Sequence, residues 1–299
     1  MDPVDFQRNR RLGIGDAVRA LAREFRSAGV ETPDLDARLL VTAATGVTRE
    51  EILTDPSRVI EEPAQAKLGE YRHRRLAKEP VSRILGQRGF YGRRFQVTPA
   101  TLDPRADSET LVDAVLELVA AEGWQSKPLR ILDVGTGSGC LLVTLLAELP
   151  SASGLGTDIS EAALATACVN ARTHGVTGRI GFELRRGLDG VVGPFDILVS
   201  NPPYIASSDI AGLDESVRIY DPLSALDGGP DGLDIYREIF AGLLGVVPTG
   251  WSLFEVGSTQ AKAVTDLARA AIPVHRLTSS RSWRDYGGHT RSVAVRTQL

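Results

Sequence analysis

Several features are scarce or absent in this chain of 299 residues, and each absence excludes a class of protein. Only two cysteines occur, Cys140 and Cys168, which is too few for a disulfide framework. Both stand in apolar segments of helical character, so reduced and buried thiols are expected. No apolar run approaches the length of about 18 residues that a membrane span needs, and no N-terminal signal pattern is found. These absences favour a cytoplasmic protein with no membrane contact.

The net charge is small and histidines are few. The net charge of −4 gives no electrostatic reason to expect stable nucleic-acid binding. The four histidines show no spacing typical of a metal site, so no metal is expected. They are His73, His174, His275 and His289.

Residues 1–82 have the pattern of a helical domain. Val18, Leu21 and Phe25 recur at helical spacing. The next helix is bounded by Pro33 at its first position and Gly46 after its end. "TREE" at 48–51 matches a capping box. A third helix, within 63–80, carries the basic run 72–75, which is typical of a solvated face, although an acidic partner could contact it.

Residues 83–104 predict a β-hairpin linker with its turn near Gly92. From 105 to 299, strands alternate with helices, which predicts an α/β, Rossmann-like domain with a mostly parallel sheet. The last two strands have a short connection, so the last is expected to be antiparallel. The expected strands are 129–135, 153–159, 179–185, 195–200, 250–257, 273–279 and 291–297.

The segment "DVGTGSGCL" follows the first strand of this domain and opens a helix. Its glycines allow a tight turn, and the helix N-terminus behind them supplies free N–H groups. Asp158 ends the next strand, where a carboxylate meets the ribose hydroxyls of a nucleotide-like ligand. Nicotinamide dinucleotides and S-adenosyl-L-methionine both fit this frame. The G-x-G-x-G spacing lacks the third glycine of G-x-G-x-x-G and so favours the second. The candidate donor-binding residues are Gly135, Thr136, Gly137, Ser138, Gly139 and Asp158.

The segment "SNPPYIA" at 200–206 follows the apolar run "FDILVS". The two prolines stiffen the chain, and open α/β sheets bind ligands at the carboxyl ends of their strands. Asn201 and the Pro202 carbonyl can accept the two hydrogens of an NH₂ group, while Tyr204 offers a flat face. Such a corner would position an amide or aromatic amine, a poor nucleophile, against a methyl donor.

These motifs resemble those of class I S-adenosyl-L-methionine methyltransferases. "LDPRADSETLV" (102–112), "YDPLSALDGGPDGLDIYREI" (220–239) and "WRDYGGHTRSVAVR" (283–296) narrow the resemblance to the glutamine-N5 methyltransferases of peptide-chain release factors, the PrmC/HemK family. The resemblance covers nearly the whole chain. It implies methyl transfer to the glutamine of a release factor's Gly-Gly-Gln loop, with the N-terminal helices docking another part of that partner. A monomer is expected.

The resemblance also implies roles for particular residues. The donor would contact 135–139, Asp158 and Asn201. The catalytic residues would be Asn201, Pro202 and Tyr204. The substrate would contact these three residues and Pro203. Relatives often carry an Asp-Trp pair beside the adenine; here Arg186 and Gly187 occupy those positions. Gly187 is therefore included among the donor-binding residues, with Leu188 or Asp189 as alternative contacts.

Other functions remain open at this point. The same chemistry could serve a glutamine of a large-subunit ribosomal protein, or the amino group of adenine in DNA. A non-catalytic binding module and a nicotinamide oxidoreductase are alternatives from other classes. Methyl transfer to purified release factor, ribosomal protein and DNA would separate the first three.

Overall fold

The computed structural model describes residues 12–285 and 287–299. The chain divides into two units, Met1–Gly86 and Gln87–Leu299, which are described separately. Residues 1–11 of the predicted helical domain, and Tyr286 in the C-terminal motif, lie outside the described part. No helix in that part is both long and apolar enough to cross a membrane.

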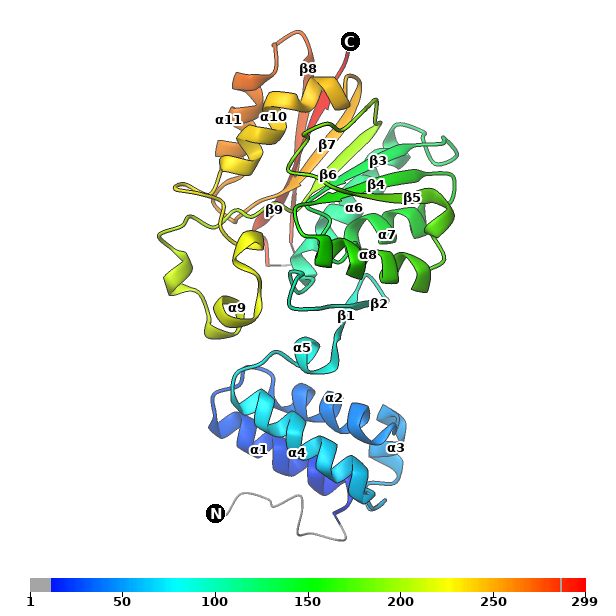
Figure 1. Cartoon of the computed structure of the whole chain (residues 1–299), viewed down its shortest axis with the longest axis vertical. Coiled ribbons are helices and arrows are strands. Elements are labelled where there is room, and N and C mark those ends of the chain that lie inside the picture. The colour runs from blue at the N-terminus through cyan, green and yellow to red at the C-terminus, as the bar shows by residue number, and fades with distance from the viewer. Residues whose placement is uncertain (1–11, 286) are drawn as a thin grey trace. The chain divides into compact units, whose positions relative to one another are not determined.

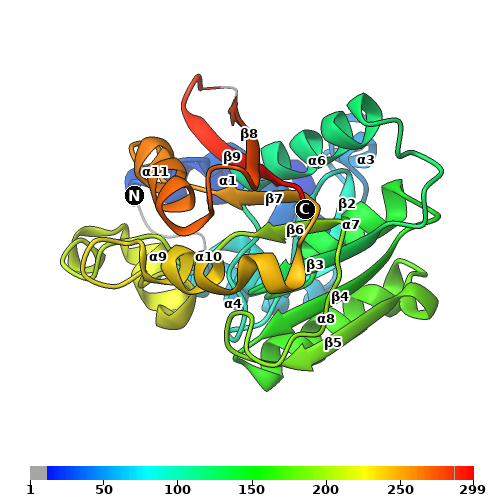
Figure 2. The same ribbon diagram turned by 90° about the horizontal axis from the view of Figure 1, so that it is seen from above.

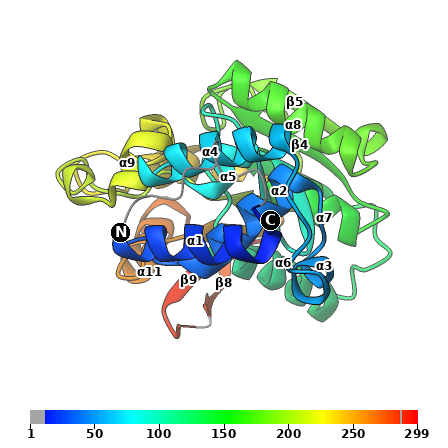
Figure 3. The same ribbon diagram turned by 90° about the horizontal axis from the view of Figure 1, so that it is seen from below.

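The first unit is helical, as predicted. Its helices bury a core of their own that includes Leu21, Phe25, Leu40 and Leu68, and α1, α2 and α4 pack side by side (Figure 3). The helices are α1 (Ile14–Ser27), α2 (Pro33–Thr45), α3 (Arg49–Thr54), α4 (Glu62–Leu76) and α5 (Val81–Leu85).

Local sequence signals fix several of these helix ends. Gly46 ends α2 in the left-handed conformation with φ 74°. Thr48 and Glu51 form the predicted capping box at the start of α3. Helix α5 was not predicted, because its five residues are too few to show a period; Gly86 closes it with φ 68°.

The basic run on α4 is paired within its own unit. Arg72 bonds to Glu24, Arg74 to Glu79, and Arg75 to Asp36. These three arginines are partly buried in ion pairs, so the prediction of a solvated helix face is wrong in part, and contact with an acidic partner stays a prediction.

The second unit opens with the hairpin β1 (Gln87–Phe90) and β2 (Arg93–Gln96). Its turn has positive φ at both Tyr91 and Gly92, which is the geometry that two-residue hairpins favour. Phe90 and Phe95 are buried in the same core as the helices and strands that follow.

A seven-stranded sheet forms the centre of this unit, in the order β5-β4-β3-β6-β7-β9-β8. β3 through β7 are parallel, and β9 is antiparallel to both of its neighbours, as expected for the last strand. The strands are β3 (Arg130–Val134), β4 (Ser153–Asp158), β5 (Ile180–Leu184), β6 (Ile197–Ser200), β7 (Gly250–Glu255), β8 (Leu277–Arg284) and β9 (Thr290–Thr297).

Helices cover both faces of this sheet (Figures 1 and 2). Ile131 and Ile197 pack with α6, α7 and α8 on one face, whereas Leu132 and Leu198 pack with α10 and α11 on the other. Burial on both faces explains why these strands read as continuous apolar runs. The helices are η1 (Ala106–Ser108), α6 (Glu109–Ala121), α7 (Cys140–Glu148), α8 (Glu161–Thr173), η2 (Thr177–Arg179), η3 (Ile210–Gly212), α9 (Glu215–Tyr220), η4 (Leu223–Ala225), α10 (Asp234–Val246) and α11 (Ala261–Ala271).

The prediction for the cysteines is wrong in part. Cys140 and Cys168 lie on helices and are free thiols, but Cys168 is exposed and Cys140 only partly buried. An apolar helical segment does not fix which of its small residues faces the core.

Candidate active site

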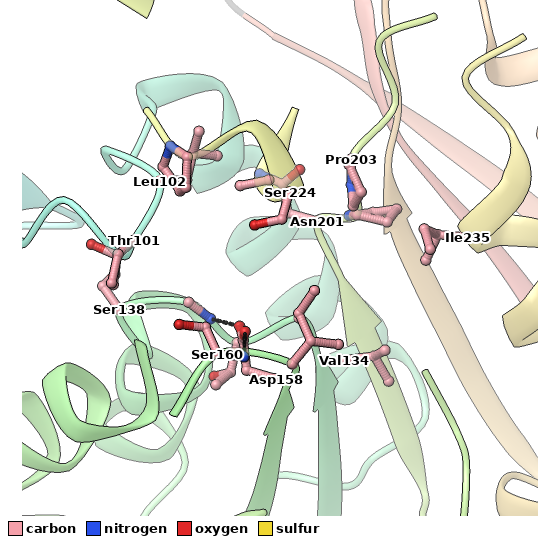
Figure 4. Close-up of a pocket in the computed structure, with 18 of the residues that line it drawn as sticks. Thr101, Leu102, Val134, Ser138, Asp158, Ser160, Asn201, Pro203, Ser224 and Ile235 are labelled. Atoms are coloured by element: carbon pink, nitrogen blue, oxygen red, sulfur yellow. Dashed lines mark hydrogen bonds between the residues drawn. The ribbon is translucent and has the colours of Figure 1, made fainter. Parts of the chain in front are cut away.

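A pocket of about 470 Å³ lies at the carboxyl ends of β3, β4, β5 and β6. Open parallel sheets place their ligands at this edge. Figure 4 shows Asn201 and Pro203 on one side of the pocket, facing Asp158 and Ser160 on the other. Two strand ends that are far apart in the sequence therefore meet at one cavity.

The loop after β3 lines the floor of this pocket. Gly135, Gly137 and Gly139 all have positive φ, between 55° and 77°, which favours glycine at each position. A Cβ at Gly135 or Gly137 would meet no heavy atom within 4 Å, so the backbone there borders open space. The loop can therefore be approached closely by a ligand.

Asp158, at the end of β4, holds this loop in place. Its Oδ2 accepts a hydrogen bond from the Gly137 N–H and its Oδ1 one from the Ser160 N–H, both at 2.9 Å. Each carboxylate oxygen has a second lone pair. The carboxylate can thus organise the loop and still accept hydrogen bonds from a ligand.

The remaining predicted residues of the loop also reach the pocket. Thr136 and Ser138 line it and are themselves buried. The Thr136 hydroxyl donates to Asp133 Oδ2 at 2.7 Å, and the Ser138 carbonyl accepts from Asn170 at 2.8 Å. Both contacts tie the loop to the elements behind it.

Asn201 lines the opposite side together with Pro202 and Pro203. Its side-chain nitrogen donates to the Ser108 hydroxyl at 3.0 Å. The Ser108 hydroxyl in turn donates to Glu255 Oε2. With its nitrogen engaged in this way, Asn201 has its carbonyl oxygen left as an acceptor.

Tyr204 is not among the residues that line the pocket. Its ring packs against the core on the α10 side, and its carbonyl accepts from Gln260 at 2.9 Å. Burial raises the pKa of its phenol to about 12, so the ring stays neutral. The Tyr204 phenol also interacts electrostatically with Glu255, Arg105 and Arg291.

Two segments form the rim on the side of Leu102 and Ser224, namely 100–105 and 222–225. Asp221 joins them, because its Oδ2 binds Arg105 at 2.5 Å and its Oδ1 accepts from the Asp103 N–H at 3.2 Å. This contact spans 116 residues of sequence. The family-like segments around 105 and 221 therefore meet at one ion pair.

The end of the pocket at β5 is built by Arg185, Arg186 and Gly187. Arg186 forms an ion pair with Glu238 of α10 at 2.6 Å. Neither Leu188 nor Asp189 lines the pocket, and Leu188 instead packs against Gly242. Among the described residues that line the pocket none is aromatic.

Glu255 and Ser108 are functional candidates that the sequence analysis did not identify. Glu255 ends β7 and is only 2% exposed. The signal was present as one acidic residue in the otherwise apolar run "SLFEVG", since a fully buried carboxylate needs a specific reason.

Burial raises the pKa of the Glu255 carboxyl from 4.5 to about 7, against the opposing effect of the Ser108 hydrogen bond. Between pH 4.5 and 7 the folded protein keeps the Glu255 proton that the unfolded chain releases. The free energy of unfolding therefore falls as pH rises toward 7. Glu255→Gln is therefore expected to raise the free energy of unfolding at pH 8 by about 2 kcal/mol and to change it little at pH 5. Urea unfolding at the two pH values measures this; equal stability at pH 8 would contradict it.

The comparisons with known proteins agree with this arrangement. The PrmC N-terminal domain model matches residues 16–86, and the methyltransferase small domain model matches 108–214. The fold resembles the catalytic domain of hMettl16 solved with a MAT2A 3′UTR hairpin, with a TM-score of 0.54 at 14% identity over 91% of this chain and 90% of that one. Fold and site together define an S-adenosyl-L-methionine-dependent methyltransferase.

Full-length relatives give the particular family. The chain is 42% identical over 285 residues to the release factor glutamine methyltransferase of Bradyrhizobium diazoefficiens, covering 95% of this chain and 94% of that protein. It is 42% identical over 286 residues to the enzyme of the same name from Caulobacter vibrioides, covering 94% and 96%. The chain belongs to the release factor glutamine methyltransferase family, which confirms the resemblance drawn from its motifs.

Proposed function

We propose that this enzyme transfers a methyl group from S-adenosyl-L-methionine to the side-chain amide nitrogen, N5, of the glutamine in the Gly-Gly-Gln loop of a peptide-chain release factor. One observation carries the residue-level proposal. Asn201 lines the same pocket as the glycine loop and Asp158, and its amide nitrogen is held by Ser108. An acceptor oxygen thus stands beside the space suited to the methyl donor.

The order of strands suggests how the donor lies. We place its reactive end near Asn201, directly after β6, and its ribose near Asp158 at the end of β4. The loop after β3 lies between them. The adenine then extends to the end of β5, where Ile159, Arg186 and Gly187 line the pocket. The residues present therefore fit the donor.

S-adenosyl-L-methionine supplies an electrophilic methyl group on a sulfonium. Asn201 Oδ1 and the Pro202 carbonyl accept the two hydrogens of the glutamine NH₂ and orient its nitrogen. Because that lone pair is delocalised into the amide, holding both hydrogens favours a pyramidal nitrogen and aligns it for attack. The nitrogen would gain the methyl group as the methyl–sulfur bond breaks, which releases S-adenosyl-L-homocysteine, and it would lose one proton to solvent. No side-chain base is needed to hold the reactants.

Pro203 and Tyr204 complete the acceptor side. Pro203 lines the pocket next to Asn201. Tyr204 lies outside the pocket lining with its ring against the core, so we assign it to supporting this corner from behind. The carbonyl contact with Gln260 fixes the backbone of this corner.

We assign the first unit to docking of another part of the release factor. The exposed leucines Leu35 and Leu39 stand one helical turn apart on α2, outside the core of that unit. With a release factor as partner, we expect the enzyme to act in the cytoplasm, as a monomer.

The experiment is mass spectrometry of tryptic peptides, and of nucleosides from digested DNA, after incubation with S-adenosyl-L-methionine. Purified release factor, a large-subunit ribosomal protein and DNA are compared as acceptors. One methyl group on the glutamine of the Gly-Gly-Gln peptide alone is the expected result. Methylation of the ribosomal protein or of DNA adenine, with the release factor unmodified, would overturn the proposal.

Arg186 gives a test of the donor's placement. Among the described residues that line the pocket none is aromatic, so we assign stacking on the adenine to the planar guanidinium of Arg186. A cation–π contact at an exposed site contributes about 0.5–1 kcal/mol, so Arg186→Ala is expected to raise the dissociation constant of S-adenosyl-L-methionine about fourfold. Calorimetry measures this.

The matched control for this variant is Arg269→Ala. Arg269 pairs with Asp266 on α11 and does not line the pocket. If Arg186→Ala binds the donor as tightly as the control does, the adenine does not stack on Arg186.

A further inference from the structure

The proposed chemistry gives no role to Glu255, the buried carboxylate that stands behind Ser108 and Asn201. Glu255 at the end of β7, Ser108 at the end of η1 and Asn201 after β6 come from three segments and meet in one line of hydrogen bonds. Glu255 and Ser108 are 2% and 3% exposed. A buried carboxylate is costly, so its retention beside a reactive site calls for a role.

The direction of this chain follows from donor and acceptor counts. An ionised carboxylate only accepts, so the single Ser108 proton must point at Glu255. The Ser108 oxygen can then only accept from Asn201. Asn201 must present its NH₂ to Ser108 and to Glu255, with which its side chain also forms a hydrogen bond, and its carbonyl oxygen is left for the pocket. The charge on Glu255 thus selects one of the two amide orientations of Asn201.

We propose that Glu255 is a positioning residue that acts on Asn201, directly and through Ser108, to fix the acceptor oxygen of Asn201 toward the glutamine NH₂. The inference rests on the proposed function, because it gives Asn201 the role of holding that NH₂. With a neutral side chain at 255, Ser108 can donate to Asn201 instead. The Asn201 amide can then turn its own NH₂ toward the substrate, where two donors would face each other.

Protonation of Glu255 has the same effect as a neutral replacement. Its charged and titratable surroundings come from five segments: Asp107 of η1, Cys140 of α7, Tyr204 after β6, Tyr236 of α10 and Arg291 of β9. Arg291 also pairs with Asp107 and Asp285, at 2.9 Å each, so its charge is shared. Burial raises the pKa of Glu255 to about 7. Turnover is therefore expected to fall as pH drops through about 7.

The test compares Glu255→Gln, Ser108→Ala and Ser108→Thr in the full-length enzyme with purified release factor. Loss of a buried hydrogen bond to a charged group corresponds to about a tenfold to hundredfold change in kcat, where that bond acts in the transition state. Glu255→Gln is expected to lower kcat by about thirtyfold and to remove the acid limb of the pH profile. Ser108→Ala is expected to lower kcat about tenfold, and Ser108→Thr, which keeps the hydroxyl, to recover most of that loss. Donor affinity should stay within about threefold throughout.

A second measurement, the titration of the Glu255 carboxyl, does not depend on catalytic activity. Carbon-13 NMR of the Glu255 carboxyl in the ligand-free enzyme should titrate near pH 7, and Ser108→Ala should raise that midpoint by removing a hydrogen bond to the ionised form. An unmoved midpoint in Ser108→Ala would contradict the hydrogen-bonded chain.

The kinetic outcomes separate this inference from the proposed function. A Glu255→Gln enzyme with wild-type kcat and the same acid limb would overturn the positioning role. Loss of donor binding together with kcat would also overturn it, since that pattern marks a general structural role. If either occurred while Asn201→Ala still lost turnover, the proposed function would stand. Failure of the wild-type enzyme to methylate the release factor would instead refute the function itself.

Discussion

Asn201→Ala is expected to lower kcat about a thousandfold and to leave the dissociation constant of S-adenosyl-L-methionine within about threefold. Removal of one preorganised polar group aimed at a reacting centre costs roughly 10²–10³ in kcat. Alanine at 201 removes the acceptor oxygen and leaves Ser108 without its donor. The donor contacts at Asp158 and the glycine loop remain intact. Single-turnover kinetics and calorimetry measure the two quantities.

Ser208→Ala is the control for this variant. Ser208 follows the same corner, is exposed, donates its hydroxyl to its neighbour Asp209, and does not line the pocket. Its kcat should match that of the wild type. An Asn201→Ala enzyme within fivefold of the control would show that the assigned role of Asn201 is wrong.

Asp158→Ala is expected to raise the dissociation constant of S-adenosyl-L-methionine about a hundredfold. The substitution removes the acceptors of the Gly137 and Ser160 N–H groups, and it removes the lone pairs proposed to meet the ribose. Each unpaired polar group costs about 1–3 kcal/mol, so a hundredfold loss is reached by one or two of them. Asp158→Asn keeps one acceptor oxygen, so its dissociation constant for S-adenosyl-L-methionine should lie between those of the wild type and Asp158→Ala.

Glu161→Ala is the matched control, because it removes an exposed carboxylate from the first turn of α8, close to Ser160, without touching the pocket. Its donor affinity should equal that of the wild type. Equal affinity of Asp158→Ala and Glu161→Ala would refute the ribose contact.

The sequence predicted those parts of the site that sit at strand ends. The glycine loop, Asp158 and Asn201 each follow an apolar run directly, and parallel strands bring their carboxyl ends to one edge. Strand type and order of appearance were therefore enough to predict that these residues share a pocket.

The supporting contacts were harder to predict, because they depend on pairs far apart in sequence. Ser108 and Glu255 are separated by 147 residues, and Arg105 and Asp221 by 116. No periodicity links such pairs. The rim segment 222–225 and helix α9 lie in an irregular connection whose turns carry no apolar period.

Tyr204 shows a different limit. Its neighbours Asn201, Pro202 and Pro203 line the pocket, but the aromatic ring turns toward the core beside α10. A stiff corner fixes the backbone, while the direction of the next side chain depends on which apolar surface lies nearest.

The Glu255 carboxyl combines an expected loss of protein stability at pH 8 with a proposed gain in turnover. This conflict between stability and activity is typical of functional sites.

The most direct test is a crystal structure of the enzyme with S-adenosyl-L-homocysteine and a release factor, or a peptide that contains its Gly-Gly-Gln loop. The glutamine nitrogen is expected within hydrogen-bond distance of both Asn201 Oδ1 and the Pro202 carbonyl, with Asn201 Nδ2 still on Ser108. A glutamine nitrogen bound by other groups, or an Asn201 amide turned the opposite way, would contradict the account.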